Sequence, residues 1–305
     1  MRSFIGLTKR NLLVFFKDRQ SVVFSLLTSI IVLALYLLFL KGTFVDAMND
    51  VLNAYAGLSD VITATDIDMF ANLVLLTGII GSAMITVPYN CLTTVVEDRE
   101  TKIDYDILAT PVKRWQIILA YFTAAALSSI ILTGIILTAG LFIISLQGNL
   151  FLTGTDILRA YMVVALGSVS ATAIFMILVL FFKTTSASGA FFGILSAASG
   201  FVIGAYIPIS QFSSPVQTLC NLFPASHITI MLRNIFMNGI LGHMDESLNG
   251  IDGGMFVSTI KDLFSFKAHL FENSLEMSGM LVYVLAALVI SIIAQTVVFA
   301  RTYKK

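Results

Sequence analysis

The side chains best placed to do chemistry cluster between two long apolar runs, in residues 94–116. An acidic–basic–acidic group and an apolar group follow one another there: Glu97, Asp98, Arg99 and Glu100, then Ile103, Ile107, Leu108 and Pro111. Ile103, Ile107 and Leu108 share one face of a helix, which Pro111 ends. A short amphipathic helix can dock in a groove on a partner protein. On charge alone, a solvated loop is an equally good interpretation.

No arrangement of residues predicts catalysis or a metal site. The chain has no G-x-x-x-x-G-K-[ST] phosphate loop, so we expect it not to hydrolyse ATP itself. His243 and its acidic neighbours do not match the ligand spacing of standard metal sites. Cys91 and Cys220 are isolated in apolar segments, which is typical of packing residues. We expect no catalytic residue, no metal and no cofactor in this chain.

The elements that must position the charged cluster are membrane helices. Hydrophobic residues make up 57% of the chain and charged residues 12%, against about 25% charged in soluble domains. A helix needs about 20 mostly apolar residues to cross a bilayer. The runs that meet this requirement are Val22–Leu40, Phe70–Val96, Ile117–Leu146, Tyr161–Phe182, Ser188–Ile207 and Ser278–Ala300.

None of these runs contains Asp, Glu, Lys, Arg or His in its interior. Carriers coupled to protons or sodium use such groups within the membrane, so energy for transport would have to come from a partner. Lysine and arginine are concentrated in the N-terminal tail, the 94–116 link, the 183–187 link and the C-terminal tail. By the positive-inside rule both termini are cytoplasmic.

Two segments are expected on the outer side. The acidic stretch Lys41–Met69 reads as a loop. In the second, Gln217–Leu241 is apolar but broken at Asn221 and Pro224, which predicts a re-entrant or interfacial hairpin. Beyond it, helical spacing predicts a short amphipathic helix from Phe256, Ile260, Leu263, Phe264 and Phe271.

The 94–116 segment resembles the inner loop of ABC-2 type permeases, the membrane subunits of ATP-binding cassette exporters. Asp98, Arg99 and Glu100 match the acidic-Arg-Glu cluster of that family, and Ile107 to Pro111 match its Leu-Leu-x-Thr-Pro end. Lys102 and Ile103 stand where Gly-Thr is usual. In the family this loop contains the coupling helix that contacts the ATPase. Phe223-Pro224-Ala225, followed by an apolar helix, is similar to the family's extracellular hairpin.

The resemblance implies an all-α integral membrane protein with six transmembrane helices in the ABC-2 (type V exporter-like) layout. Residues 1–20 would form a cytoplasmic amphipathic interface helix, and 21–207 helices one to five with the inner coupling loop 94–116. Residues 208–277 would be extracellular, with the re-entrant hairpin, and 278–305 the sixth helix and a cytoplasmic tail. The implied partners are a cytoplasmic ABC ATPase, which binds ATP and Mg, and a second permease chain; nucleic acid is not expected.

Uncharged polar groups in the second and fifth runs are candidates for a translocation path: Asn72, Thr77, Thr86, Asn90, Ser196 and Ser199. Gly189/Gly193 and Gly200/Gly204 have the small-xxx-small spacing of closely packed helices, either within one subunit or along a dimer axis. A path of this composition suits an amphipathic or lipid-like substrate.

The function we predict is outward transport of an amphipathic, drug-like, peptide or lipid-linked substrate across a bacterial plasma membrane. Two alternatives stay open. One is a membrane scaffold or sensor acting through Gly242–Met277, and the other is an ATP-independent carrier or channel. The sequence leaves open the substrate, the choice between homo- and heterodimer, and the role of residues 242–277.

Overall fold

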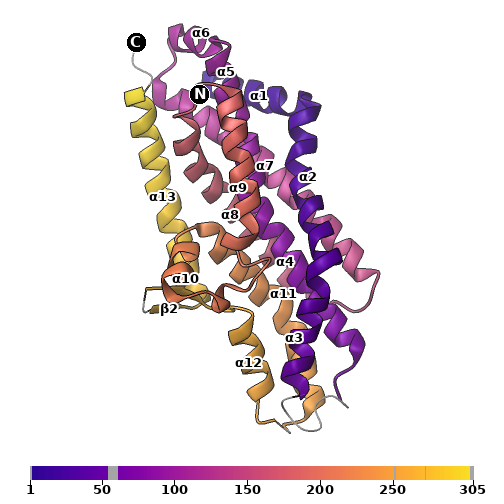
Figure 1. Ribbon diagram of the computed structural model, residues 1–305. Helices are drawn as coiled ribbons and strands as arrows, with labels where there is room; N and C mark the ends of the chain where they lie inside the picture. The colour runs from indigo at the N-terminus through magenta and orange to yellow at the C-terminus, as the bar shows by residue number, and fades with distance from the viewer. Residues whose placement is uncertain (1, 54–60, 251, 272, 303–305) are drawn as a thin grey trace.

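The computed structural model describes residues 2–53, 61–250, 252–271 and 273–302. Asp60 of the acidic stretch and the end of the C-terminal tail lie outside these residues. Within them, six helical segments are long and apolar enough to span a membrane. They form an elongated bundle in which helix α1 and the end of helix α13 lie at the same end (Figure 1). We call this the terminal end, and the opposite end the distal end.

The elements succeed one another as follows. The first half contains α1 (Arg2–Lys17), α2 (Arg19–Leu35), the π-helix η1 (Tyr36–Leu40), α3 (Lys41–Asn53), α4 (Ala64–Cys91), α5 (Thr93–Glu100), α6 (Ile103–Ala109) and α7 (Arg114–Ser145). The second half contains α8 (Gly154–Val179), α9 (Thr185–Val202), the 3-10 helix η2 (Ile209–Gln211), α10 (Ser214–Asn221), α11 (Pro224–Leu248), α12 (Met255–Leu263), β1 (Ala268–Leu270), β2 (Asn273–Leu275) and α13 (Met277–Thr302).

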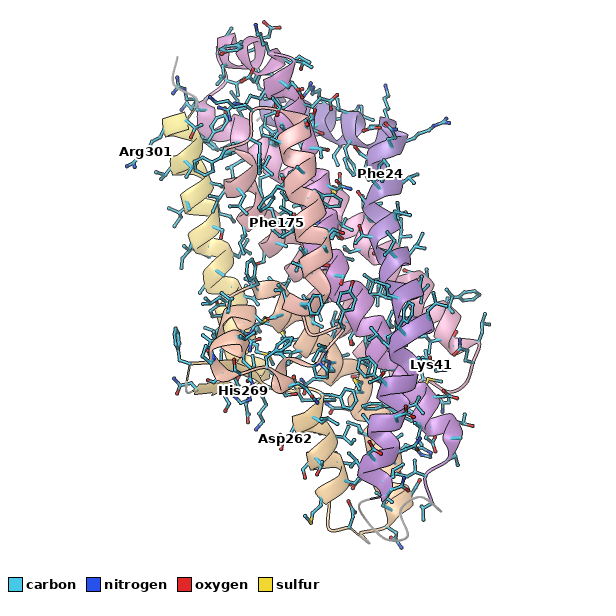
Figure 2. The ribbon with its side chains drawn as sticks, in the orientation of Figure 1. Phe24, Lys41, Phe175, Asp262, His269 and Arg301 are labelled. Atoms are coloured by element: carbon cyan, nitrogen blue, oxygen red, sulfur yellow. The ribbon has the colours of Figure 1, made fainter. Side chains whose placement is uncertain are left out.

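Helix α4 is the centre of the bundle and packs against α2, α7, α8, α9 and α11. Its most apolar stretch is buried throughout, whereas few residues of α9 and α13 are buried. Figure 2 shows the same contrast in two side chains: Phe175 lies between the helices and Phe24 points away from them. Apolar residues facing outward all round the bundle are expected of a protein whose solvent is lipid.

The six predicted spans are confirmed, but the first extends further than expected. Helix continues without interruption from Arg19 to Asn53, and α4 begins at Ala64, so the loop predicted at Lys41–Met69 is wrong at both of its ends. The reason at the first end is an apolar stripe at four-residue spacing, Phe44, Met48 and Leu52, which is buried on one face of α3. The Phe44 ring lies 5.8 Å from that of Phe264, so α3 packs against residues 208–277, which we call the distal segment.

The distal segment breaks where the sequence predicts, with α10 ending at Asn221 and α11 starting at Pro224. The predicted amphipathic helix is α12, which buries Phe256 and Ile260. Phe271 was wrongly included in it. It lies next to the short antiparallel pair β1–β2 and is 71% exposed. Within the described residues, this strand pair is the departure from an all-helical fold.

A buried cation joins this segment to the membrane helices. Arg233 of α11 is almost fully buried, and its guanidinium donates to the carbonyls of Gly204 and Phe264. These carbonyls follow the last turns of α9 and α12, where helices leave unpaired acceptors and partial negative charge. Arg233 therefore fixes the C-terminal ends of α9 and α12 to α11.

Candidate functional site

The charged segment forms two short helices at the terminal end of the bundle. Helix α5 continues the direction of α4 after a break at Leu92, and α6 follows after Thr101 and Lys102. Lys102 has a backbone φ of 64°, a left-handed conformation that costs a non-glycine residue about 1 kcal/mol. This explains why glycine is usual at the corresponding place in the loop that the segment resembles. The turn forms here despite the lysine.

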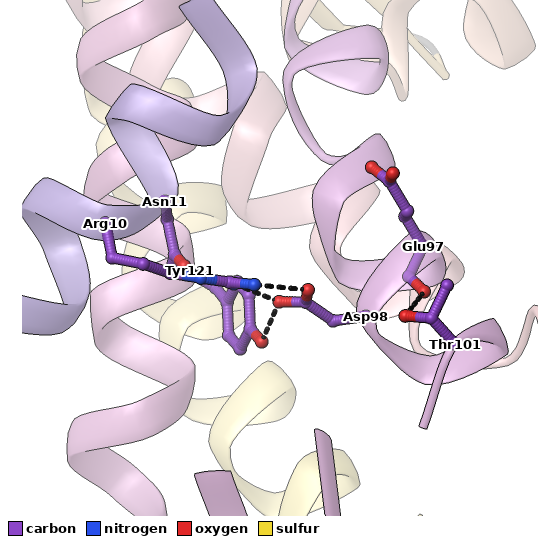
Figure 3. Close-up of polar contacts among 6 residues, drawn as sticks. All are labelled: Arg10, Asn11, Glu97, Asp98, Thr101 and Tyr121. Atoms are coloured by element: carbon purple, nitrogen blue, oxygen red, sulfur yellow. Dashed lines mark hydrogen bonds and ion pairs between the residues drawn. The ribbon is translucent and has the colours of Figure 1, made fainter. Parts of the chain in front are cut away.

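Asp98 holds α5 against two other helices (Figure 3). Its carboxylate is almost fully buried and accepts a bidentate pair of hydrogen bonds from Arg10 of α1, one of them at 2.6 Å. It also accepts from the Tyr121 hydroxyl of α7 at 2.5 Å. The hydrogen bond to Asp98 raises the pKa of Arg10 further. A charge pair with bidentate geometry and a third donor is the arrangement that compensates burial of a carboxylate.

The next two residues bind the ends of α8 and α9. Arg99 donates to the carbonyls of Leu180 and Phe182, at 2.7 and 3.1 Å, just past the end of α8. Glu100 accepts from the backbone N–H and the hydroxyl of Thr185, at 2.8 and 2.6 Å, at the start of α9. Both contacts pair a charge with the helix end of opposite partial charge.

Asp98, Arg99 and Glu100 thus connect α5 to α1, α7, α8 and α9 within one chain. The sequence marked these three as functional but gave no sign that their partners are intramolecular. Reasoning from sequence missed Arg10, Tyr121 and Thr185. The only signal for Arg10 in the sequence was its place among the basic residues of the amphipathic N-terminal segment.

A different set of residues faces away from the bundle. Glu97, Ile103 and Pro111 are exposed, as is Tyr105, which sequence reasoning did not single out and which is 66% exposed. Of the remaining predicted residues, Ile107 is buried and Leu108 partly buried, so they attach α6 to the bundle. The shared face predicted for Ile103, Ile107 and Leu108 is therefore divided between solvent and core.

Beside α6 lies an open polar cavity of about 450 Å³. It is bordered by residues from α5, α6, the α8–α9 link and the end of α13: Arg99, Glu100, Lys102, Asp104, Tyr105, Leu108, Lys183, Thr184 and Thr302. Burial raises the pKa of Asp104, whose Oδ1 has no hydrogen-bond partner among the described residues. A cavity with charges of both signs and an exposed tyrosine at its edge suits a protein partner.

The candidate path residues of α4 do not share one surface. Asn72 donates to Gln147 at 2.7 Å, and Thr77 and Thr86 bond to carbonyls of their own helix. All three are buried within the subunit. Asn90 is buried as well, but it donates to Ser25 of α2 at 3.2 Å and borders a small cleft of about 70 Å³ between α4 and α9.

Helix α9 presents one open face of small side chains. A Cβ added at Gly189 or Gly193 would meet no other atom within 4 Å, and Ser196 is partly exposed while Ser199 is buried. Gly200 and Gly204 pack inside the chain instead. Gly200 lies against the Tyr206 ring, and Gly204 has φ 69° in the turn after the helix. The second small-xxx-small pair is therefore not a helix-packing motif.

Among the described residues, no group of three or more His, Cys, Asp or Glu side chains is placed to hold a metal ion. Two comparisons with known proteins complete these observations. The sequence profile of a family described as "ABC-2 family transporter protein" matches residues 58–301. None of the proteins with curated descriptions is found to match the chain. The family match covers more than half of the sequence and includes α4 to α12, with all the charged residues of α5 and α6.

Proposed function

The chain belongs to the ABC-2 family as the membrane permease component of such a transporter, and from this premise we propose that it exports an amphipathic substrate using ATP hydrolysed by a separate subunit. The observation that carries the proposal is the contact set of Asp98, Arg99 and Glu100. One short segment at the terminal end is bonded to four different helices, so a force applied there reaches most of the bundle.

The ATPase docks on α6 and the adjacent polar cavity. The exposed contacts come from Tyr105, Ile103 and Glu97. Ile107 and Leu108 attach α6 to the rest of the bundle. Asp98, Arg99 and Glu100 then act as transmitting residues rather than as contacts to the partner. When ATP binding displaces α6, the bonds to Arg10, Tyr121 and Thr185 move α1, α7 and α9 together.

The substrate path lies between two permease chains, along the face formed by α2 and α9. Small residues at Gly189 and Gly193 allow close approach of a second helix, and Asn90 and Ser196 supply polar groups on the same side. The exposed residues of α2 are largely apolar, among them Val23, Ile30 and Ile31. A path with apolar walls and few uncharged polar groups fits an amphipathic molecule better than an ion.

The terminal end is cytoplasmic in this proposal. Lysines and arginines of α1, the 94–116 segment and the 183–187 link gather there, in accordance with the positive-inside rule. Exposed Ile5, Leu13 and Phe16 on α1 lie beside Lys9 and Lys17, a composition suited to the surface of an anionic inner leaflet. The membrane is the plasma membrane of a bacterium.

Co-purification from native membranes tests the proposal. The wild-type chain should bring with it a stoichiometric protein that contains a phosphate-loop motif and hydrolyses ATP. Tyr105→Arg should lower the amount of that protein at least about tenfold, since aromatic anchors at interfaces are worth 2 kcal/mol or more. Phe271→Arg is the matched control, because Phe271 is equally exposed at a site remote from α6.

Two results would contradict the proposal. One is the absence of any nucleotide-binding partner, even after crosslinking from residue 105. The other is equal recovery of the ATPase with both variants. The first result would favour the scaffold or sensor hypothesis, with residues 242–277 as the working part.

A further inference from the structure

A cavity of about 580 Å³ opens on the side of the bundle where α8, α11 and α13 meet. Its walls are mainly apolar and include Met162 and Leu166 of α8, Met231 of α11, and Met277 and Leu281 of α13. Methionine side chains are flexible and adapt to ligands of variable shape. The volume is within the range of small-molecule sites.

A second cavity, of about 390 Å³, adjoins the first. Arg159, Ile235 and Met277 border both spaces. The lining of the second contains more polar side chains than that of the first, among them Asp156, Asn234 and Asn238. One continuous depression therefore has mainly apolar walls at one end and several polar side chains at the other, with Arg159 bordering both parts.

The depression lies where two membrane-spanning helices begin. Helix α8 starts at Gly154 and α13 at Met277, so Arg159 and Asp156 belong to the first turns of α8. From Arg159 to Leu166 the apolar part extends about 10 Å along the helix, at 1.5 Å per residue. A leaflet's hydrocarbon layer is about 15 Å thick, so the apolar part reaches well into it from the polar edge.

We propose that this depression binds one membrane phospholipid of the distal leaflet, with an acyl chain in the apolar part and the headgroup at Arg159. Arginine is the residue suited to phosphate because its planar fork offers paired donors. The Arg159 side chain is about two-thirds exposed and 3.5 Å from Asp156, in an i,i+3 pair. It is thus held at the mouth of the cavity yet remains accessible to a phosphate.

The acidic neighbours specify the headgroup further. Two carboxylates border the depression: Asp156 lines the second cavity, and Glu276, which lies 3.3 Å from Lys267, lines the first. They repel a headgroup whose net charge is negative and attract an ammonium next to the phosphate. The ligand is therefore a zwitterionic phospholipid such as phosphatidylethanolamine, in preference to the anionic phosphatidylglycerol. This binding does not depend on transport, because the lipid is a component of the membrane itself.

Native mass spectrometry of the full chain, released from nanodiscs containing equal amounts of phosphatidylethanolamine and phosphatidylglycerol, tests the proposal. The expected result is one phosphatidylethanolamine retained per chain in preference to phosphatidylglycerol. Arg159→Gln should weaken retention about tenfold, the worth of a hydrogen bond to a charged group. Lys41→Gln, which removes a cation that pairs with Asp68 elsewhere on the protein, should leave retention unchanged.

A filling variant supplies a second measurement. Leu166→Trp occupies the apolar part and should abolish retention, whereas Leu158→Trp, at an exposed position of the same helix outside the cavity, should not. Retention that survives both Arg159→Gln and Leu166→Trp would overturn the site. Equal or greater retention of phosphatidylglycerol would overturn the headgroup assignment. Because Arg159 is exposed, its substitution tests the site even if Leu166→Trp does not fold.

Discussion

At the scale of single residues, the carboxylate of Asp98 has the greatest structural consequence at the terminal end. Three hydrogen bonds from Arg10 and Tyr121 converge on it, and its burial means that water cannot replace a partner that is removed. The energetic value of such a group is visible mainly when one member is deleted.

Asp98→Asn should therefore lower stability by about 1–3 kcal/mol, seen as a lower thermal midpoint of the detergent-purified protein. Arg10→Gln should cost more, because it leaves the buried Asp98 carboxylate without its cation, whereas Asp98→Asn leaves Arg10, whose side chain is 31% exposed and can be solvated. The double variant should be little worse than Asp98→Asn alone, as expected for residues that share one interaction. Strictly additive effects would show that Arg10 and Asp98 are not coupled.

Lys102 gives a prediction in the opposite direction. Its left-handed backbone costs a lysine energy that a glycine does not spend, so Lys102→Gly should raise stability by up to about 1 kcal/mol. Lys102→Val should lower it, since a β-branched side chain is worse in this conformation. If thermal unfolding ranks valine above glycine, the turn does not have the geometry described.

At the scale of elements, close approach between backbones decides how the distal helices pack. Gly239 of α11 faces the loop before α8, where an added Cβ would lie 1.9 Å from the carbonyl oxygen of Phe151. Backbone atoms cannot move aside as a flexible side chain does. The position of α11 against the start of α8 thus requires glycine at 239. Gly239 also lines the second cavity of the proposed lipid site.

Gly239→Ala should destabilise the protein by roughly 1–3 kcal/mol, the usual range for overpacking. Gly242→Ala is the control on the same helix, because an added Cβ there meets nothing within 4 Å. It should be neutral or stabilising by up to about 1 kcal/mol, from helix propensity alone. Equal thermal midpoints for the two alanine variants would refute the close contact.

At the scale of the whole molecule, the exposed face of α9 is suited to packing against a second chain. Gly189 and Gly193 have no neighbour that explains their small size. A second chain packed on this face would explain it, in agreement with the proposed dimer.

Gly193→Leu should accordingly weaken dimer association in mild detergent, measured by light scattering, by about 5- to 30-fold if close helix packing supplies about 1–2 kcal/mol. Gly134→Leu is the control, since Gly134 of α7 also has open space around it but lies on another helix. A dimer fraction unaffected by Gly193→Leu would place the second chain elsewhere or remove it from the proposal.

The sequence by itself determined the class of this protein. Apolar runs of sufficient length specify membrane helices wherever they occur, since the backbone must satisfy its own hydrogen bonds in lipid. The helical spacing of Phe256 and Ile260 likewise predicted α12. The loop motif around Arg99 then pointed to the family, because its residue types follow one another in the chain.

Only the tertiary structure decided what those residues touch. The partners of Asp98, Arg99 and Glu100 come from α1, α7, α8 and α9, and no local pattern connects residues so far apart. The helical extension through α3 needed α12 and α4 to cover Phe44 and Met48. Arg233 could be recognised as a helix-end partner only once α9 and α12 ended beside it. Contacts between distant segments depend on how the helices are arranged, and that arrangement is set by packing of the entire bundle.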